Sequence, residues 1–177
     1  MSTQVHSEGN APNETRRSRT YHWEDPLIAT RVALQKSGIE MMRALVAGEL
    51  SPPPVAETLG FRLIAVDRGR AVFTIRAAEY MYNPIGSVHG GVYATLLDSA
   101  AGCAVHTMLP AGTRYTSLDL SVKFLRSMTP ESGEVRCTGA VIHLGSSTAL
   151  AEARMTDEKD RLLATATSSC LIFPPSG

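Results

Sequence analysis

An apolar segment near the middle of the chain places the strongest constraint on its fold. From Val92 to Val105 the only charged residue is Asp98, and apolar residues occupy nearly every side of a helix built over this segment. A helix that is apolar all round belongs in a protein interior. We therefore predict a buried helix over 92–108 that ends before Pro110. Its small residues would let a curved sheet approach the helix backbone closely: Ala94, Ala100, Ala101, Gly102 and Ala104.

The segments on either side of this helix have the composition of β-strands. Two β-rich runs, 61–67 and 71–77, are separated by Arg68-Gly69-Arg70, which is typical of a tight hairpin. Four later runs are separated by turns rich in Gly, Ser, Pro and Asp, and we predict strands over 116–126, 134–143, 148–155 and 162–173. The expected fold class is α+β, with an antiparallel sheet packed against one helix.

The N-terminal region is expected to add a tail and one helix. Residues 1–22 are polar and lack a hydrophobic period, which is typical of a disordered terminus. Asp25-Pro26 supplies a helix cap and a first-turn proline, so we predict a helix over 26–47. Gly48 and Pro52-Pro53-Pro54 would end it. The expected organisation is a tail (1–22), a helical segment (23–50) and one domain (51–177).

Composition excludes several classes of protein. The chain has 17 basic and 17 acidic residues, which argues against nucleic acid as a partner. It contains neither an apolar stretch of the roughly 20 residues that a membrane span needs nor the apolar core of a secretory signal, so we expect a cytoplasmic protein. The three cysteines lack Cys-x-x-Cys spacing and the five histidines are scattered, so neither a disulfide framework nor a metal site is expected.

Two features of the central helix could carry chemistry. A buried carboxylate at Asp98 would need hydrogen bonds, a charged partner or a chemical task, unless its side chain simply emerges into water. His89-Gly90-Gly91 stands where the helix begins, and the first amides of a helix lack intrahelical acceptors and suit a developing oxyanion. The alternative is a glycine-rich turn that His89 caps. Together, the two features would supply an electrophile-activating site and a base for water.

Several motifs, in the same order, resemble the PaaI-type acyl-CoA thioesterases. They are the run from Asn83 to Val92, Leu96-Leu97-Asp98, the run from Ser117 to Arg126, and Ala149 to Arg154. The resemblance extends from about Leu59 to Phe173. It implies a hotdog fold, in which an antiparallel sheet wraps around a central α-helix, and a homodimer or homotetramer with shared active sites. The N-terminal helix would be an additional flank outside this core.

The resemblance also implies residue roles. Asp98 would be the general base or nucleophile, the Gly90 amide would donate to the thioester oxygen, and Asn83 would help to hold that oxygen. His89 would lie near the sulfur, and Ser117 would orient water or Asp98. Each has a structural alternative: Asn83 could only shape the turn before Pro84, and Ser117 could be an ordinary polar residue on a strand.

Substrate-binding positions are expected at Gly91, Tyr82 and Arg126. Arg126 is a candidate partner for the coenzyme A phosphates, although an arginine at a strand end is equally often a solvated surface residue. The chain departs from the family pattern at Ser127, where proline is common. It departs again at Gly145-Ser146-Ser147, where a basic residue is common, and this difference affects how phosphates would be held.

The expected function is hydrolysis of acyl-coenzyme A thioesters without a metal or redox cofactor. The alternatives are a hydratase or dehydratase acting on acyl thioesters, and a non-catalytic acyl-CoA-binding protein. Gly90 and Asp98 are eight residues apart, which is about 12 Å along a helix axis. They can hardly serve the same carbonyl, so a twofold dimer is expected in which Asn83 and Gly90 of one chain face Asp98 and Ser117 of the other.

Overall fold

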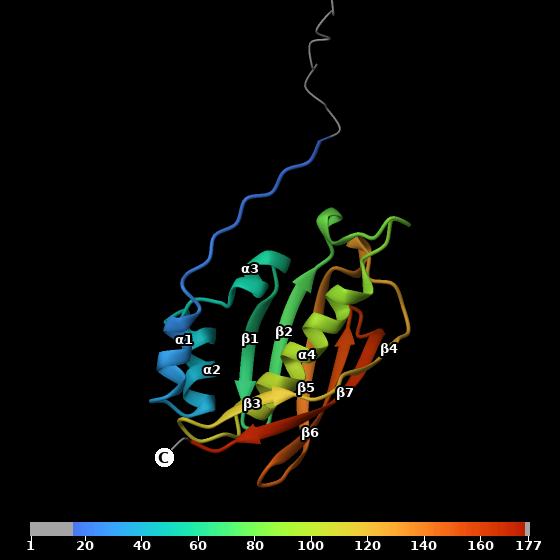
Figure 1. Ribbon diagram of the computed structural model, residues 1–177. Coiled ribbons are helices and arrows are strands. Elements are labelled where there is room, and N and C mark those ends of the chain that lie inside the picture. Colours follow the sequence, from blue (N-terminus) through green and yellow to red (C-terminus); the bar gives the residue numbers. More distant parts are fainter. Residues whose placement is uncertain (1–15, 176–177) are drawn as a thin grey trace, which may run out of the picture.

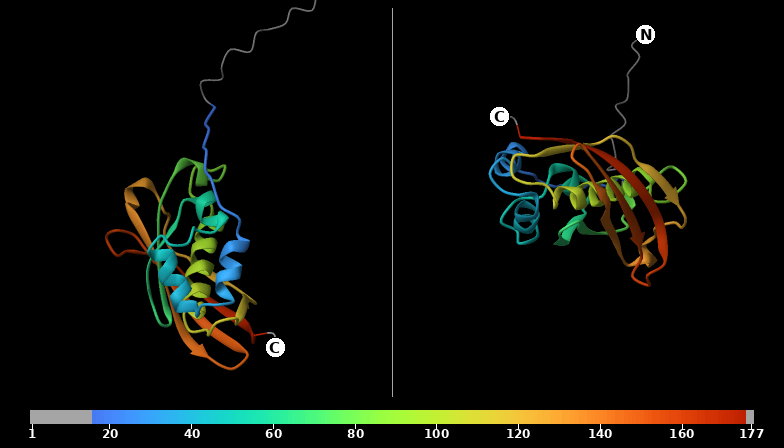
Figure 2. Two further views of the ribbon diagram at one scale, coloured as in Figure 1. Left: turned by 90° about the vertical axis from the view of Figure 1, so that its left-hand side faces the viewer. Right: turned by 90° about the horizontal axis from the view of Figure 1, so that it is seen from below.

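The computed structural model describes residues 16–175, which form a curved antiparallel sheet wrapped around one long helix (Figures 1 and 2). The strands are β1 (Arg62–Asp67), β2 (Arg70–Arg76), β3 (Arg114–Ser117), β4 (Ser121–Phe124), β5 (Glu134–Leu144), β6 (Thr148–Thr156) and β7 (Leu162–Phe173). Their order in the sheet is β1-β2-β5-β6-β7-β3, and β4 also pairs with β7. All pairings between these strands are antiparallel, so the predicted α+β class is confirmed.

The central helix, α4, spans Gly90–His106 and begins and ends two residues earlier than predicted. It begins early because His89 caps it: the Gly91 amide donates to Nδ1 of His89 over 2.8 Å. The helix lies across the concave face of the sheet, and its apolar residues face strands β2, β5, β6 and β7. Leu96, Leu97, Ala100, Ala101 and Ala104 are fully buried.

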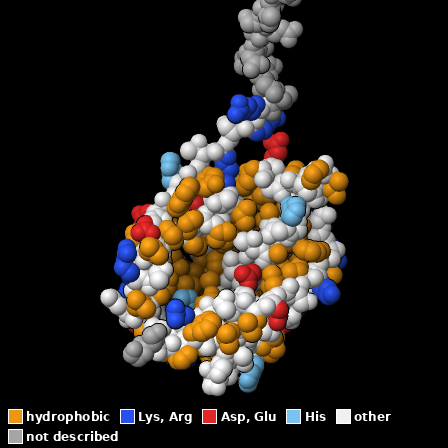
Figure 3. Space-filling view, in the orientation of Figure 1, with side chains coloured by type: hydrophobic (Ala, Val, Ile, Leu, Met, Phe, Trp, Pro, Cys, Tyr) orange, Lys and Arg blue, Asp and Glu red, His pale blue; other side chains and the backbone are white. Residues whose placement is uncertain are grey.

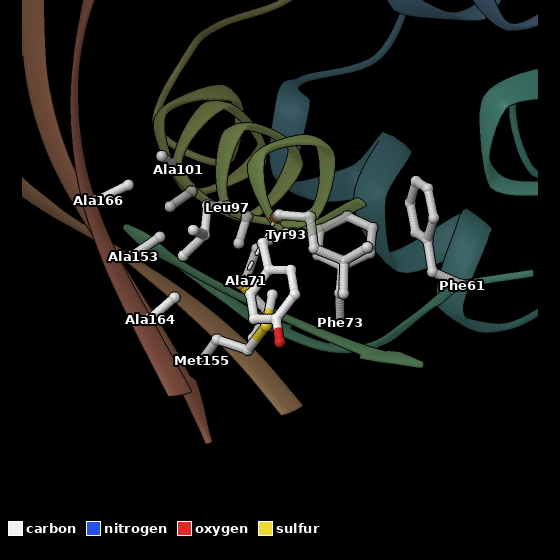
Figure 4. Packing of buried hydrophobic residues seen from close by; sticks show 14 of the residues in the cluster. Phe61, Ala71, Phe73, Tyr93, Leu97, Ala101, Ala153, Met155, Ala164 and Ala166 are labelled. Carbon is white, nitrogen blue, oxygen red and sulfur yellow. Dashed lines mark hydrogen bonds between the residues drawn. The ribbon is translucent and has the colours of Figure 1, made fainter. Parts of the chain in front are cut away.

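Small residues allow the close approach of helix and sheet that the sequence predicts. A Cβ at Gly139 of β5 would lie only 2.0 Å from the carbonyl oxygen of Ala100, so no larger residue fits without moving the backbone. Figure 4 shows alanine side chains of the sheet facing the helix around Leu97 and Ala101. Short side chains on both surfaces therefore let α4 pack closely against the sheet.

The N-terminal region contains two short helices rather than the single predicted helix over 26–47. These are α1 (Leu27–Ala33) and α2 (Gly38–Val46). The break is explained by a capping box, because the backbone N–H of Ser37 donates to the Glu40 carboxylate over 2.9 Å and starts a new helix. α2 packs against β1 and the end of α4, and α1 lies beside α2 (Figure 2).

Two further predictions of secondary structure are corrected. A third short helix, α3 (Pro54–Leu59), begins where the prolines were expected only to end a helix, because proline is favoured in a first helical turn. The predicted strand over 116–126 is two strands, β3 and β4. Both pair with β7, and one extra residue lies between Ser117 and Ser121 where Asp119 accepts a hydrogen bond from the Ser169 amide over 3.0 Å.

The predicted tail lies mostly outside the described residues, because only 16–22 of its 1–22 are described. In that segment the Arg19 guanidinium lies 4.0 Å from the ring centroid of Tyr80 and donates to the Glu57 carbonyl over 2.9 Å. The segment therefore contacts α3. Across residues 16–175, no helix has the length and apolar character needed to cross a bilayer.

Candidate active site

The carboxylate of Asp98 is half-buried near the middle of α4, opposite the end of β3. Its Oδ1 accepts a hydrogen bond from the Ser117 hydroxyl over 2.8 Å. No second partner is found for the carboxylate among residues 16–175. One oxygen is therefore fixed in direction by Ser117, while the other is left free to act on a ligand or a water molecule.

Asp98 and Ser117 lie where two hollows meet. The larger is a cavity of about 810 Å³ between α2, β1 and α4. The smaller is an open groove of about 390 Å³ beside residues 118–120. Both hollows include Asp98 and Ser117 in their walls. Figure 3 shows a hollow with a hydrophobic floor and an acidic side chain at its edge. An extended ligand could place an apolar part in the cavity and a polar part in the groove while its middle contacts the carboxylate.

The turn before α4 is organised by Asn83. Its Oδ1 accepts hydrogen bonds from the amides of Ile85, over 3.1 Å, and Ser87, over 3.2 Å. Its Nδ2 donates to the Ser87 hydroxyl over 3.0 Å. Asn83 therefore shapes the turn, as in the structural alternative. An amide NH₂ group carries two hydrogens, so a second donor remains after the bond to Ser87.

The two amides at the start of α4 differ in availability. The Gly91 amide is capped by Nδ1 of His89, so Gly91 cannot also offer this donor to a ligand. The same bond requires an unprotonated Nδ1, which places the proton of a neutral His89 on Nε2. The Gly90 amide has no acceptor within the described part of the chain. Of the two predicted glycines, Gly90 is therefore the one whose backbone N–H is free to donate, and the helix dipole polarises this N–H.

Tyr82 and Arg126 lie away from both hollows. Tyr82 is half-buried and pairs with Val88 through an isolated β-bridge. Arg126 is exposed, and its Nη1 donates to the carbonyl of Leu162 over 2.7 Å. The guanidinium has five N–H donors, so others remain available for an anion. Neither residue lines the cavity or the groove.

The predicted site residues form two separate groups. Asp98 and Ser117 are in direct contact, and Asn83, His89 and Gly90 are close in sequence around the start of α4. Because α4 is continuous from Gly90 to His106, the eight residues between Gly90 and Asp98 hold the two groups about 12 Å apart along the axis.

Two cavity residues near Asp98 were missed from the sequence, Cys103 and Tyr115. Burial, followed by the nearby charge of Asp98, raises the pKa of the Cys103 thiol to about 12. Burial also raises the pKa of Tyr115 well above its usual 10. Both groups therefore stay protonated at neutral pH, which excludes Cys103 as a thiolate nucleophile. Tyr115 could have been found by strand alternation, because it lies two residues before Ser117 and so on the same face of β3.

A curved antiparallel sheet wrapped around one buried helix is the hotdog fold. The chain belongs to the thioesterase superfamily, whose family model matches residues 85–164. It is 32% identical over 107 residues to a 1,4-dihydroxy-2-naphthoyl-CoA hydrolase of Listeria monocytogenes, a match that covers 60% of this chain and 85% of that protein.

Solved structures agree with the fold. The PaaI protein of the Escherichia coli phenylacetic acid degradation operon has a TM-score of 0.68 at 22% identity, with 79% of this chain and 99% of that chain covered. A phenylacetic acid degradation-related protein of Ralstonia eutropha has a TM-score of 0.66 at 29% identity, with coverage of 73% and 98%. The predicted hotdog fold and the predicted family resemblance are thus confirmed, and the protein is a thioester hydrolase.

Proposed function

We propose that this protein hydrolyses acyl-coenzyme A thioesters to a carboxylic acid and free coenzyme A, with Asp98 as general base or nucleophile. The observation that carries this proposal is the position of Asp98. Its carboxylate is oriented by Ser117 where a largely apolar cavity meets a more open groove. A thioester joins an apolar acyl group to a polar carrier, and its carbonyl would lie at this junction.

The chemistry needs no group beyond those of the chain and water. Acting as a base, Asp98 takes a proton from a water molecule as the water oxygen attacks the carbonyl carbon. The carbonyl π electrons move to oxygen and return as the C–S bond breaks, and the coenzyme A thiolate then takes up the proton. Acting as a nucleophile, Asp98 forms an anhydride with loss of the thiolate, and water hydrolyses the anhydride. Ser117 fixes the carboxylate in both routes.

A donor for the developing oxyanion is proposed to come from a second copy of the chain. The free Gly90 amide is polarised by the helix dipole, but about 12 Å of helix separates it from Asp98 of the same chain. In a twofold dimer, Gly90 of one protomer can face Asp98 of its partner. The spare Asn83 donor and the Nε2–H of His89 would then lie near the thioester oxygen and sulfur.

Exposed apolar residues near the groove support such a dimer. Leu118, Phe124 and Leu125 each expose more than half of their surface, and they flank or belong to the short strand β4. Large apolar side chains grouped on a surface are typical of protein–protein interfaces.

A cytoplasmic location is also part of the proposal, because all three cysteines are free thiols, as expected in a reducing compartment.

A panel of aliphatic and aromatic acyl-CoA thioesters tests the proposed reaction. The Listeria relative is named for a bicyclic aromatic acyl-CoA, so naphthoyl thioesters belong in the panel. Free coenzyme A should appear in step with the acid, measured with a chromogenic thiol reagent. Formation of an enoyl or hydroxyacyl thioester would instead indicate a hydratase or dehydratase. Tight binding with no product would indicate a binding protein.

The shared site has a complementation test. Asn83→Ala and Asp98→Ala should each be nearly inactive alone. When the two are co-expressed and pair at random, about half of the dimers are mixed, and each mixed dimer has one intact and one doubly defective site. Activity should therefore recover to about a quarter of wild type. No recovery in verified mixed dimers would reject a site built from two chains.

A further inference from the structure

We infer that the cavity beneath α2 is the acyl-binding pocket, and that α2 sets the length of acyl group the enzyme accepts. The group expected in this cavity is a large, uncharged hydrocarbon acyl group. The inference rests on the proposed function, because the cavity is assigned to the acyl part of a thioester whose carbonyl lies at Asp98. It also gives a role to the N-terminal helices, which the sequence indicates only as an additional flank.

Besides the loop 48–53 and the end of β3, three parts of the chain form the walls of the cavity. One helical face of α4 begins at Asp98 and continues through Ser99, Gly102 and Cys103. The floor includes Phe61 and Phe73, whose rings meet edge to face with centroids 5.7 Å apart; Figure 4 shows Phe73 beside α4 and Phe61 farther out. The opposite wall consists of apolar side chains of α2: Met41, Met42, Leu45 and Val46. The apolar path thus leads from the carboxylate to α2.

The size and charge of the cavity indicate which kind of acyl group it can bind. Its volume of about 810 Å³ is in the upper part of the range typical of pockets for drug-sized ligands, roughly 300–1,000 Å³. An acetyl group would leave most of it empty. Apart from Asp98, the only charged lining residue is Arg62, which is exposed at the start of β1. A carboxylated acyl group would lose its hydration there without gaining a buried partner.

The position of α2 is fixed by close backbone contacts. The Gly38 amide donates to the Leu109 carbonyl over 3.0 Å. A Cβ at Gly38 would lie 1.7 Å from the carbonyl oxygen of His106, so the start of α2 touches the end of α4 directly. The preceding helix is also tied down, because the Gly112 amide donates to the Ala33 carbonyl over 3.1 Å. A wall held in this way can limit the length of an acyl chain.

Leu45 is the position at which to change the length limit. It is half-buried on α2 and lines the cavity. Leu45→Trp should shorten the pocket, and Leu45→Ala should lengthen it. Leu34→Trp is the matched control, because Leu34 is 60% exposed just after α1 and does not line the cavity. If Leu45→Trp does not fold, Leu45→Ala decides the question alone.

The measurement is the affinity of non-hydrolysable S-alkyl-coenzyme A thioethers, from ethyl to dodecyl, by titration calorimetry. For the wild type, affinity should rise about fourfold with each added methylene until the cavity is full, and then level off. Leu45→Trp should weaken the long thioethers by about tenfold or more, because the indole occupies the space of at least two methylenes. It should leave the ethyl compound unchanged. Leu45→Ala should move the plateau to a longer chain, and Leu34→Trp should match the wild type.

Affinities that do not depend on chain length would overturn the inference, as would equal effects of Leu45→Trp and Leu34→Trp. The proposed function is tested separately, by thiol release from the corresponding acyl-CoA thioesters. Length-dependent binding without any thiol release would support the pocket and refute the hydrolase reaction on these substrates. Thiol release with flat thioether affinities would support the reaction and refute the pocket.

Discussion

Gly38→Ala is a sharp test of how α2 is docked, because two effects of opposite sign compete. Alanine favours a helix over glycine by at most about 1 kcal/mol, so helix propensity alone predicts a more stable protein. The new Cβ, however, would lie 1.7 Å from the backbone oxygen of His106. Real Cβ contacts are essentially never shorter than 3.0 Å, so the two backbones must separate by more than 1 Å.

The structure predicts that the steric effect wins. Overpacking costs about 1–3 kcal/mol. Weakening the hydrogen bond from Gly38 to Leu109 costs about 0.5–1.5 kcal/mol more. After subtraction of a propensity gain of about 1 kcal/mol, the free energy of unfolding should fall by about 0.5–3.5 kcal/mol. For a domain of this size that lowers the Tm by about 1–14 °C, measurable by scanning calorimetry and urea titration.

Gly145→Ala is the control for this experiment. A Cβ at Gly145 would meet its nearest atom, the Thr148 carbonyl oxygen, at 3.3 Å, and the backbone angle φ is not positive. Its stability should therefore fall by less than that of Gly38→Ala, because a contact of 3.3 Å requires a shift of only a few tenths of an ångström. A Gly38→Ala protein as stable as the wild type, or more stable, would show that α2 is not held against α4 as described.

Three further predictions concern individual side chains. Ser117→Ala should lower kcat by about 10–100-fold through the lost hydrogen bond to Asp98, and unchanged steady-state kinetics would contradict that role. Burial lowers the pKa of His106 below its usual 6.5; the unfolded chain then binds more protons, so stability should decline as pH falls below about 6.5. His106→Gln should flatten this part of a Tm-against-pH curve, and an identical curve would refute the assignment. Cys103, with a pKa of about 12, should resist iodoacetamide at pH 8 in the folded protein, as followed by mass spectrometry, whereas rapid alkylation would contradict this raised pKa.

The central helix and its carboxylate were predictable because their signals are local. A segment of this length that is apolar on nearly every side is typical of an interior helix, and a single carboxylate within it needs a partner or a task. The contact between Asp98 and Ser117 was expected only through the family resemblance. Asp98 and Ser117 are 19 positions apart in the sequence, and this spacing does not show that β3 lies beside α4.

The features that were predicted wrongly or not at all depend on short sequence signals or on long-range contacts. The break between α1 and α2 follows from the capping box of Ser37 and Glu40. The prediction of one helix followed the apolar repeat across 26–47 instead and gave this short signal too little weight. The cavity could not be foreseen, because it forms only when α2 docks on α4 through Gly38, far from Asp98 in sequence. A backbone contact of this kind leaves no pattern in the side chains.

The role of Asp98 is tested most directly by the turnover of Asp98→Asn. Asparagine keeps the side-chain volume and an oxygen that can accept the Ser117 hydrogen bond, but it cannot take up a proton as the carboxylate does. We predict a kcat at least about a hundredfold below wild type, with unchanged thioether affinity and Tm. Asp67→Asn, at an exposed aspartate of β1, should retain full activity. A near-normal kcat for Asp98→Asn would contradict the assignment of this carboxylate as base or nucleophile.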